Sequence, residues 1–224
     1  MVDDSDDAGR SVKATRAAAR PWTSAQLLLA ATVLAVLAAA ALAADIAIAQ
    51  WMKDHGLRGE LKRLVHLSET FGWGGTVALI VLTAAVLDPR GWRVIPPLAV
   101  SAFGAGGLAD GIKLFVSRLR PSAADLSDHF SKTFIHATSQ GARGYPVQSF
   151  PSSHAATAAG LAAALAMLYP RGRWLFATFA VLAGLQRIEA QAHFASDALA
   201  GAAIGCLVAA ACQRFCCRSN CAVS

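Results

Sequence analysis

Six apolar runs, each near the length needed to cross a lipid bilayer, dominate this chain of 224 residues. A helix needs about 20 consecutive apolar residues to span the hydrocarbon core of a bilayer. The composition agrees, because 55% of the residues are hydrophobic, 15% are charged and the mean hydropathy is +0.46. We therefore predict an all-α fold, a bundle of six transmembrane helices, rather than a soluble domain. The expected spans are residues 25–50, 72–87, 94–116, 154–169, 174–191 and 194–213.

Polar segments flank and interrupt the predicted membrane domain, residues 25–213. Residues 1–24 form a polar tail, and residues 214–224 form a second tail rich in Cys and Arg. Between the first two spans, MKDHGLRGELKRLVHLSET (residues 52–70) interleaves charges with leucines near helical spacing. This pattern predicts a short amphipathic helix along the membrane surface, with His66 as a solvated interfacial residue.

The tryptophans and the basic residues predict how the chain crosses the membrane. Six crossings place Trp22, Trp92 and Trp174 at one face and Trp51 and Trp73 at the other, and each lies at a span end, where tryptophan favours the headgroup level. Lys and Arg in the shortest connections favour both termini in the cytoplasm. Small residues late in the first run resemble a signal-peptide cleavage site, but the run is longer than such peptides use, so we expect an uncleaved helix.

Three short stretches carry ionisable residues of a kind that membrane spans seldom hold. They are KLFVSRLRP at 113–121, PSSH at 151–154 and RIEAQAHFASD at 187–197. Charged side chains within a membrane are costly and usually mark function. The first stretch ends the third span, the second opens the fourth, and the third joins the fifth span to the sixth. Helix order therefore predicts that all three lie at one face of the membrane.

In the first stretch, Lys113 and Arg120 are seven residues apart. On a continuous helix two turns would return both side chains to one face, where they would converge on one anion. Pro121 is expected to end that helix. The alternative is a set of ordinary cations at a membrane boundary, of which Arg118 is an example. Asp110, three residues before Lys113, is expected to form an ion pair with that lysine.

The second stretch predicts a helix start that binds phosphate. Ser152 and Ser153 precede an Ala-rich run and suit an N-cap, where unpaired backbone N–H groups and the helix dipole attract negatively charged oxygens. His154, in the first turn, is placed to give a proton to a leaving oxygen. The alternative is a capped helix with an incidental interfacial histidine.

The third stretch predicts a nucleophile. His193 and Asp197 are one helical turn apart, so the carboxylate can hydrogen-bond the imidazole, fix its tautomer and support its attack on phosphorus. Arg187 lies six positions before His193, out of phase on a single helix, so we expect the chain to break near residues 190–192. Glu189 is expected to be an exposed turn residue.

Together the stretches follow the pattern K-x6-RP, PSGH and SR-x5-H-x3-D, and the chain resembles the type 2 phosphatidic acid phosphatase family. The resemblance covers residues 25–213. The matching positions are Lys113, Arg120, Pro121, Pro151, Ser152, His154, Arg187, His193 and Asp197. Two positions depart from the pattern, because Ser153 stands where the family has glycine and Gln186 where it has serine.

The resemblance implies a metal-independent phosphatase acting on a lipid phosphate or diphosphate. His193 would attack phosphorus and His154 would protonate the departing oxygen. The phosphate would be held by cations and a helix start, namely Lys113, Arg120, Arg187, Ser152 and Ser153. No cofactor, metal ion or nucleic acid has a role in this scheme. The Ala-rich composition and the short loops favour a bacterial inner-membrane protein, and the predicted topology then places the site at the periplasmic face.

Three alternatives remain open at this point. The family pattern extends to vanadium haloperoxidases, but six membrane spans argue against a soluble peroxidase. If an alcohol rather than water accepted the phosphoryl group, the protein would be a lipid phosphotransferase. A protein that only binds lipid phosphates needs cations and donors but no oriented nucleophile, so the pair of His193 and Asp197 argues against it. Phosphatidate, phosphatidylglycerol phosphate, an isoprenyl diphosphate and a lipid A phosphate all fit as substrates.

Overall fold

The structure is a computed structural model that describes residues 20–135 and 145–221, with side chains described as far as residue 215. The described part is helical, and its extended chain forms only two isolated bridges, which join Arg118 to Phe134 and to Gln148. The main helices are α1 (Ser24–Ala41), α2 (Asp45–Asp54), α3 (Gly59–Leu67), η1 (Ser68–Phe71), α4 (Gly74–Leu87), η2 (Gly91–Val94), α5 (Ile95–Ile112), α6 (Ser153–Leu168), α7 (Arg173–Glu189) and α8 (Ala195–Cys221). The all-helical prediction is confirmed.

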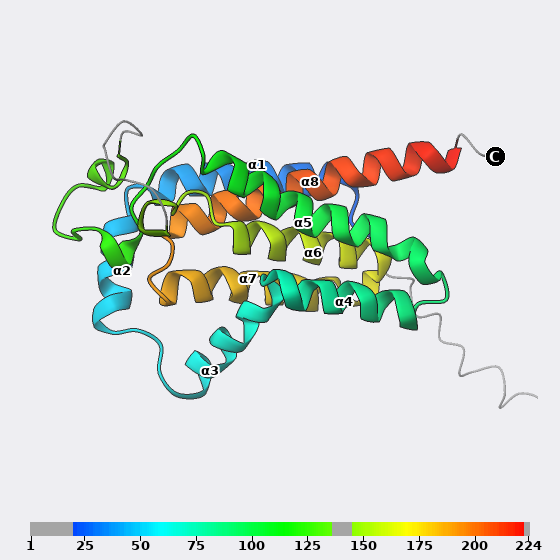
Figure 1. Ribbon diagram of the computed structural model, residues 1–224, viewed down its shortest axis with the longest axis horizontal. Helices are drawn as coiled ribbons and strands as arrows, with labels where there is room; N and C mark the ends of the chain where they lie inside the picture. Colours follow the sequence, from blue (N-terminus) through cyan, green and yellow to red (C-terminus); the bar gives the residue numbers. More distant parts are fainter. Residues whose placement is uncertain (1–19, 136–144, 222–224) are drawn as a thin grey trace, which may run out of the picture.

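Helix α6 forms the centre of the bundle, between α5 and α8 on one side and α7 on the other (Figure 1). Every residue in 155–166 is buried. Glycines make this close packing possible, because a Cβ on Gly160 would lie 2.0 Å from the carbonyl oxygen of Ser101 in α5. A Cβ on Gly205 of α8 would lie 2.5 Å from the carbonyl oxygen of Ala156. Small residues at helix interfaces are how membrane bundles bring backbones together.

Among the described residues, three helical segments are long and apolar enough to cross a membrane: α1, the continuous η2–α5 segment and α8. The segment α3–η1 and helix α4 pass the same test together, but they are bent by 70° where they meet. Helix α6 is apolar and has 16 residues, a length of about 24 Å. The membrane-protein assignment is therefore supported, and the count of six spans stays a prediction.

The first expected span, residues 25–50, is not one continuous helix. Helix α1 ends at Ala41, and a short turn leads into α2, which begins at Asp45. Asp45 is fully buried in spite of its charge. The turn therefore directs a carboxylate into the interior at a place where the sequence pattern predicts uninterrupted apolar helix.

Helix α3 packs against α7 through charged contacts. The carboxylate of Glu189 lies 3.0 Å from Nζ of Lys62 and 2.5 Å from Nε2 of His66, and only 5% of its side chain is exposed. The expectation that Glu189 is exposed is wrong, because this residue anchors α3. His66 is likewise partnered, with 41% of its side chain exposed. Three leucines of α3 are at least half exposed, and their contact with lipid stays a prediction.

The three motif stretches lie at one end of the bundle (Figure 1). The end of α5, the start of α6 and the turn between α7 and α8 meet there, near α2, whereas both described ends of the chain lie at the opposite end. At that opposite end the rings of Trp22 and Trp174 meet edge to face, with centroids 6.0 Å apart. Helix order thus brings the three stretches together as predicted. Which side of the membrane they face stays a prediction.

Gly201→Ala should destabilise the bundle. A Cβ at Gly201 of α8 would lie 2.2 Å from the carbonyl oxygen of Ser152, so the two helices would have to separate. We expect a loss of about 1–3 kcal/mol in the free energy of unfolding, as for other overpacked interiors. Gly184→Ala is the matched control in α7, because its Cβ would meet no described atom within 4 Å. Thermal unfolding in detergent compares them, and equal stability of the two variants would contradict the close contact.

Candidate active site

His193 lies in the turn between α7 and α8, which is where the predicted chain break falls. Gln191 adopts a positive φ of 54° in this turn. The backbone N–H of His193 donates to the carbonyl of Arg187 at 3.1 Å. The turn therefore brings Arg187, at the end of α7, and His193 to the same end of the bundle. On a single continuous helix these two side chains would point in different directions.

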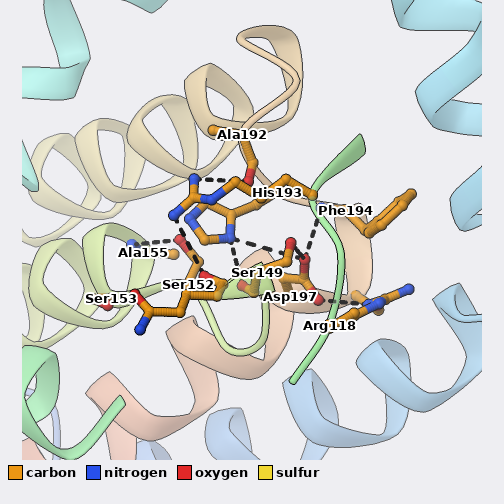
Figure 2. A network of polar contacts seen from close by, with 12 residues as sticks. Arg118, Ser149, Ser152, Ser153, Ala155, Ala192, His193, Phe194 and Asp197 are labelled. Carbon is orange, nitrogen blue, oxygen red and sulfur yellow. Dashed lines mark hydrogen bonds and ion pairs between the residues drawn. The ribbon is translucent and has the colours of Figure 1, made fainter. Parts of the chain in front are cut away.

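The imidazole of His193 is oriented by a backbone carbonyl (Figure 2). Nδ1 donates to the carbonyl oxygen of Ser149 at 2.6 Å, because a carbonyl can only accept. The nearest oxygen of Asp197 is 3.8 Å from Nδ1, beyond hydrogen-bond distance. The expected direct bond is therefore not formed, and Asp197 acts as a negative charge beside the ring. With Nδ1 engaged, Nε2 is the nitrogen available for attack.

Asp197 is held by its own set of donors. Oδ2 accepts from the hydroxyl of Ser149 at 2.5 Å and from the backbone N–H of Phe194 at 2.9 Å. Asp197 is fully buried and His193 is 2% exposed. Ser149 thus contacts both residues, the carboxylate through its hydroxyl and the imidazole through its carbonyl.

Burial also affects the charge state of His193. His193 lies in the turn outside the apolar spans, and its removal from water lowers its pKa, which the negative charge of Asp197 opposes only in part. The imidazole is therefore neutral at neutral pH. A neutral ring keeps the lone pair that attack on phosphorus requires.

The deepest contact at this end joins Arg118 to two carboxylates. Arg118, Asp45 and Asp197 are all fully buried, and the guanidinium lies 2.7 Å from Asp45 and 2.5 Å from Asp197. It also donates to the hydroxyls of Ser196 at 2.7 Å and Thr133 at 3.1 Å. The expectation that Arg118 is an ordinary boundary cation is wrong, because its side chain points into the bundle and finds its partners there.

After a turn at residues 113–115, the chain that follows α5 is extended rather than helical. The N–H of Arg118 donates to the carbonyl of Val147 at 2.9 Å, and the N–H of Ser149 donates to the carbonyl of Arg118 at 3.0 Å. This backbone pairing turns the Arg118 side chain inward. It also fixes the Ser149 carbonyl beside His193.

Lys113 and Arg120 reach the site without the helical alignment expected of them, because α5 ends at Ile112. Arg120 donates to the carbonyl of Ala192, in the α7–α8 turn, at 3.0 Å. Lys113 contacts the hydroxyl of Ser153 and lies 3.0 Å from Asp110. The expected ion pair of Lys113 with Asp110 is confirmed.

Arg187 extends from the last turn of α7 and pairs with Glu69 of η1 at 2.7 Å. Gln186, at the position where the family has serine, donates to the same carboxylate at 3.1 Å. Nε of Arg187 is buried and has no hydrogen-bond partner among the described residues. One donor of this guanidinium is therefore left unsatisfied by the described part of the protein.

Ser152 caps α6 as predicted, but its own donor is already used. Its hydroxyl accepts from the N–H of Ala155 at 3.4 Å, and its N–H donates to the carbonyl of Asp197 at 3.0 Å. The N–H groups of Ser153 and His154 lie in the first turn, where no intrahelical partner exists. The expected phosphate contact at this helix start stays a prediction, and the backbone N–H of Ser152 already has a protein acceptor.

Three positive charges of the site, those of Arg187, Lys113 and Arg120, act electrostatically on the imidazole of His154. In the part of the chain that the structure describes, no group of three or more His, Cys, Asp or Glu side chains is placed to hold a metal ion. The site combines two histidines with three cations, an arrangement suited to an anionic group.

Several residues of the site escaped sequence reasoning, namely Asp45, Glu69, Arg118, Ser149 and Ser196. Asp45 did carry a signal, because it is the only charged residue within the apolar run at 25–50. The cost of burying a charge in a membrane applies to it as much as to the motif residues. Glu69 and Ser149 lie in polar segments where no spacing sets them apart.

The family profile of the PAP2 superfamily matches residues 96–219, more than half of the chain. This range contains all three motif stretches. The chain belongs to the PAP2 superfamily. Helices α1 to α4, with Asp45 and Glu69, lie before the matched range.

Two curated proteins named lipid A 1-phosphatase are similar to this PAP2 chain. The one from Rhizobium johnstonii is 35% identical over 159 residues, which are 62% of this chain and 63% of that protein. The one from Rhizobium etli is 35% identical over 101 residues, 45% of this chain and 41% of that protein. The chain thus spans less than two thirds of the length of these relatives.

Two solved structures resemble this fold. LpxE from Aquifex aeolicus gives a TM-score of 0.60 at 18% identity and covers 77% of this chain and 96% of its own. A transmembrane PAP2-type phosphatidylglycerolphosphate phosphatase from Bacillus subtilis gives a TM-score of 0.56 at 20% identity. That match covers 88% of this chain and 96% of the Bacillus subtilis chain. At this identity the likeness shows the fold of PAP2 membrane phosphatases.

Arg118→Met should strongly destabilise the protein, because it leaves two buried carboxylates without their shared partner. Breaking a buried ion pair from one side costs about 3–5 kcal/mol. Arg63→Met is the matched control, since Arg63 pairs with Glu60 on the surface and both side chains are mostly exposed, where such pairs contribute little. Thermal unfolding of both variants in detergent provides the comparison. An Arg118→Met protein as stable as the control would contradict the buried pairing.

Proposed function

We propose that this protein is a membrane lipid phosphatase that works through a phosphohistidine at His193. One observation carries the proposal, namely that an oriented, neutral histidine with Nε2 available stands among three cations and a second histidine. Binding alone would not need His193 to be held by Ser149 and flanked by Asp197. Membership of the PAP2 superfamily agrees with this assignment.

The phosphate is proposed to lie between the cations and the start of α6. Its nonbridging oxygens would accept hydrogen bonds from the Nε donor of Arg187 and from the N–H groups of Ser153 and His154. Lys113 and Arg120 supply further positive charge. Donors fixed before the substrate arrives stabilise charge that develops in the transition state, commonly the largest catalytic contribution.

In the first step the lone pair of Nε2 of His193 forms a bond to phosphorus. The bond from phosphorus to the lipid oxygen breaks, its electron pair stays on that oxygen, and His154 donates the proton that makes it an alcohol. The bound phosphate favours protonated His154, because its negative charge offsets the three cations. Asp197 stabilises the positive charge that develops on the His193 ring.

In the second step water attacks the phosphohistidine. The water gives a proton to His154, the bond from phosphorus to Nε2 breaks, and its electron pair returns to the imidazole. Inorganic phosphate leaves, and both histidines regain their starting state. We propose that no metal ion or cofactor takes part, since the three cations supply the charge that a metal would supply elsewhere.

The substrate we propose is the 1-phosphate of lipid A or of a closely related glycolipid. The two relatives named lipid A 1-phosphatase are 35% identical to this chain over the aligned residues. Phosphatidate and phosphatidylglycerol phosphate are the comparison substrates.

We further propose a bacterial inner-membrane location with six spans, both termini in the cytoplasm and the site at the periplasmic face, so that a lipid headgroup reaches it at the membrane surface.

The test measures free phosphate released by the purified protein in detergent micelles containing each lipid phosphate and excess EDTA. His193→Ala should reduce turnover to background, and His154→Ala should reduce it about 10²- to 10⁴-fold, as expected for a general acid. His55→Ala is the control, because His55 is exposed at the end of α2.

Three results would contradict parts of the proposal. Activity lost with EDTA and restored by a metal ion would overturn the metal-independent reaction. Undiminished turnover by His193→Ala would overturn the nucleophile. Phosphate that appears only on an added alcohol would make the protein a lipid phosphotransferase.

A further inference from the structure

Asp45 reaches the active site from a part of the chain that lies before the residues matched to the PAP2 superfamily. It is the first residue of α2 and is fully buried. Its carboxylate lies 2.7 Å from the guanidinium of Arg118 and accepts from the N–H of Ser196 at 3.0 Å. It also accepts from the Ser196 hydroxyl. None of the reaction steps above uses this carboxylate.

Both partners of Asp45 lead directly to Asp197. Arg118 lies 2.5 Å from Asp197 and also donates to the hydroxyl of Ser196. Ser196 is the residue before Asp197 in the first turn of α8. Asp197 in turn contacts Ser149, whose carbonyl orients His193. A continuous series of buried contacts therefore connects Asp45 to the nucleophile.

The charges of this series explain why a second carboxylate is useful. Arg118 shares its one positive charge between Asp45 and Asp197, so the three groups together stay negative. Without the charge of Asp45, Arg118 would pair fully with Asp197 and cancel its field at the imidazole. Charges in the protein interior are poorly screened by solvent and salt. Removing the negative charge of Asp45 therefore changes the electrostatic field at His193 strongly.

We propose that Asp45 is a positioning residue for the nucleophile, acting through Arg118 and Ser196 to hold Asp197 in place and to keep its negative charge available to His193. This inference rests on the proposed phosphohistidine reaction. It assigns to α2 a part in the site that the three motif stretches do not contain.

The main test is Asp45→Asn in the full chain, which keeps the shape of the side chain and removes its charge. We expect kcat for lipid A 1-phosphate to fall about 10- to 100-fold, as for a misplaced reacting group. KM should change little, because the lost interaction acts on the transition state. Asp54→Asn is the matched control, since Asp54 is exposed at the other end of α2.

A double substitution tests whether the effect passes through Asp197. In an Asp197→Asn background, adding Asp45→Asn should cost little further activity, because the carboxylate it supports is already gone. An equal fold-loss from Asp45→Asn in both backgrounds would overturn the inference. It would mean that Asp45 acts on the site by another route.

Ser196→Ala keeps every charge and removes only the hydroxyl shared by Arg118 and Asp45. This variant is therefore the alternative test of the positioning role if Asp45→Asn does not fold. We expect a several-fold lower kcat at unchanged KM, and wild-type kcat in a folded Ser196→Ala protein would overturn the inference.

Orthovanadate provides a readout that needs no lipid substrate, because it takes up five-coordinate geometry at a phosphate site. Its affinity, measured by calorimetry, should fall in Asp45→Asn and in Ser196→Ala but not in Asp54→Asn. Wild-type protein that binds orthovanadate through His193 but hydrolyses no lipid phosphate would overturn the proposed function alone. Wild-type turnover together with unchanged orthovanadate affinity in Asp45→Asn would overturn the positioning role alone.

Discussion

A single buried guanidinium, that of Arg118, joins the parts of this protein that the active site requires. Removing an ion from water is costly, and the cost is offset only where partners with good geometry surround it. Arg118 has such partners in Asp45, Asp197 and Ser196. Arg118 lies in the chain after α5, Asp45 in α2, and Ser196 and Asp197 in α8. Three segments distant in sequence must therefore meet at one point before any of these charges can be buried.

The contacts of the site form a deep layer and a shallower layer. In the deep layer Asp197 is fully buried, and Ser149 connects it to His193. In the shallower layer the three cations Lys113, Arg120 and Arg187 are less deeply buried than Arg118. Nε of Arg187 is buried and has no hydrogen-bond partner among the described residues. The bundle around α6 supports both layers through close packing, since the backbones of neighbouring helices meet at glycines such as Gly201. A fixed arrangement of this kind is what electrostatic stabilisation of a transition state needs.

The sequence allowed the helices, the three motif stretches and their gathering at one end of the bundle to be predicted, because apolar periodicity and helix order are local properties. It failed where an outcome depends on a distant partner. Arg118 and Glu189 look like surface charges until α2 and α3 bring carboxylate or basic partners to them. The alignment of Lys113 with Arg120 failed because the chain leaves the helix at Ile112 to pair with the segment before α6.

The central claim is that this buried cluster presents His193 as the nucleophile, and the most direct measurement traps the intermediate. The full-length protein is mixed with lipid substrate, quenched in alkali, which preserves phosphohistidine, and digested for peptide mass spectrometry. The account predicts a phosphoryl group on His193 that forms and decays at the rate of turnover. A phosphoryl group on His154 or on Asp197, or turnover with no phosphorylated residue at any time, would contradict it.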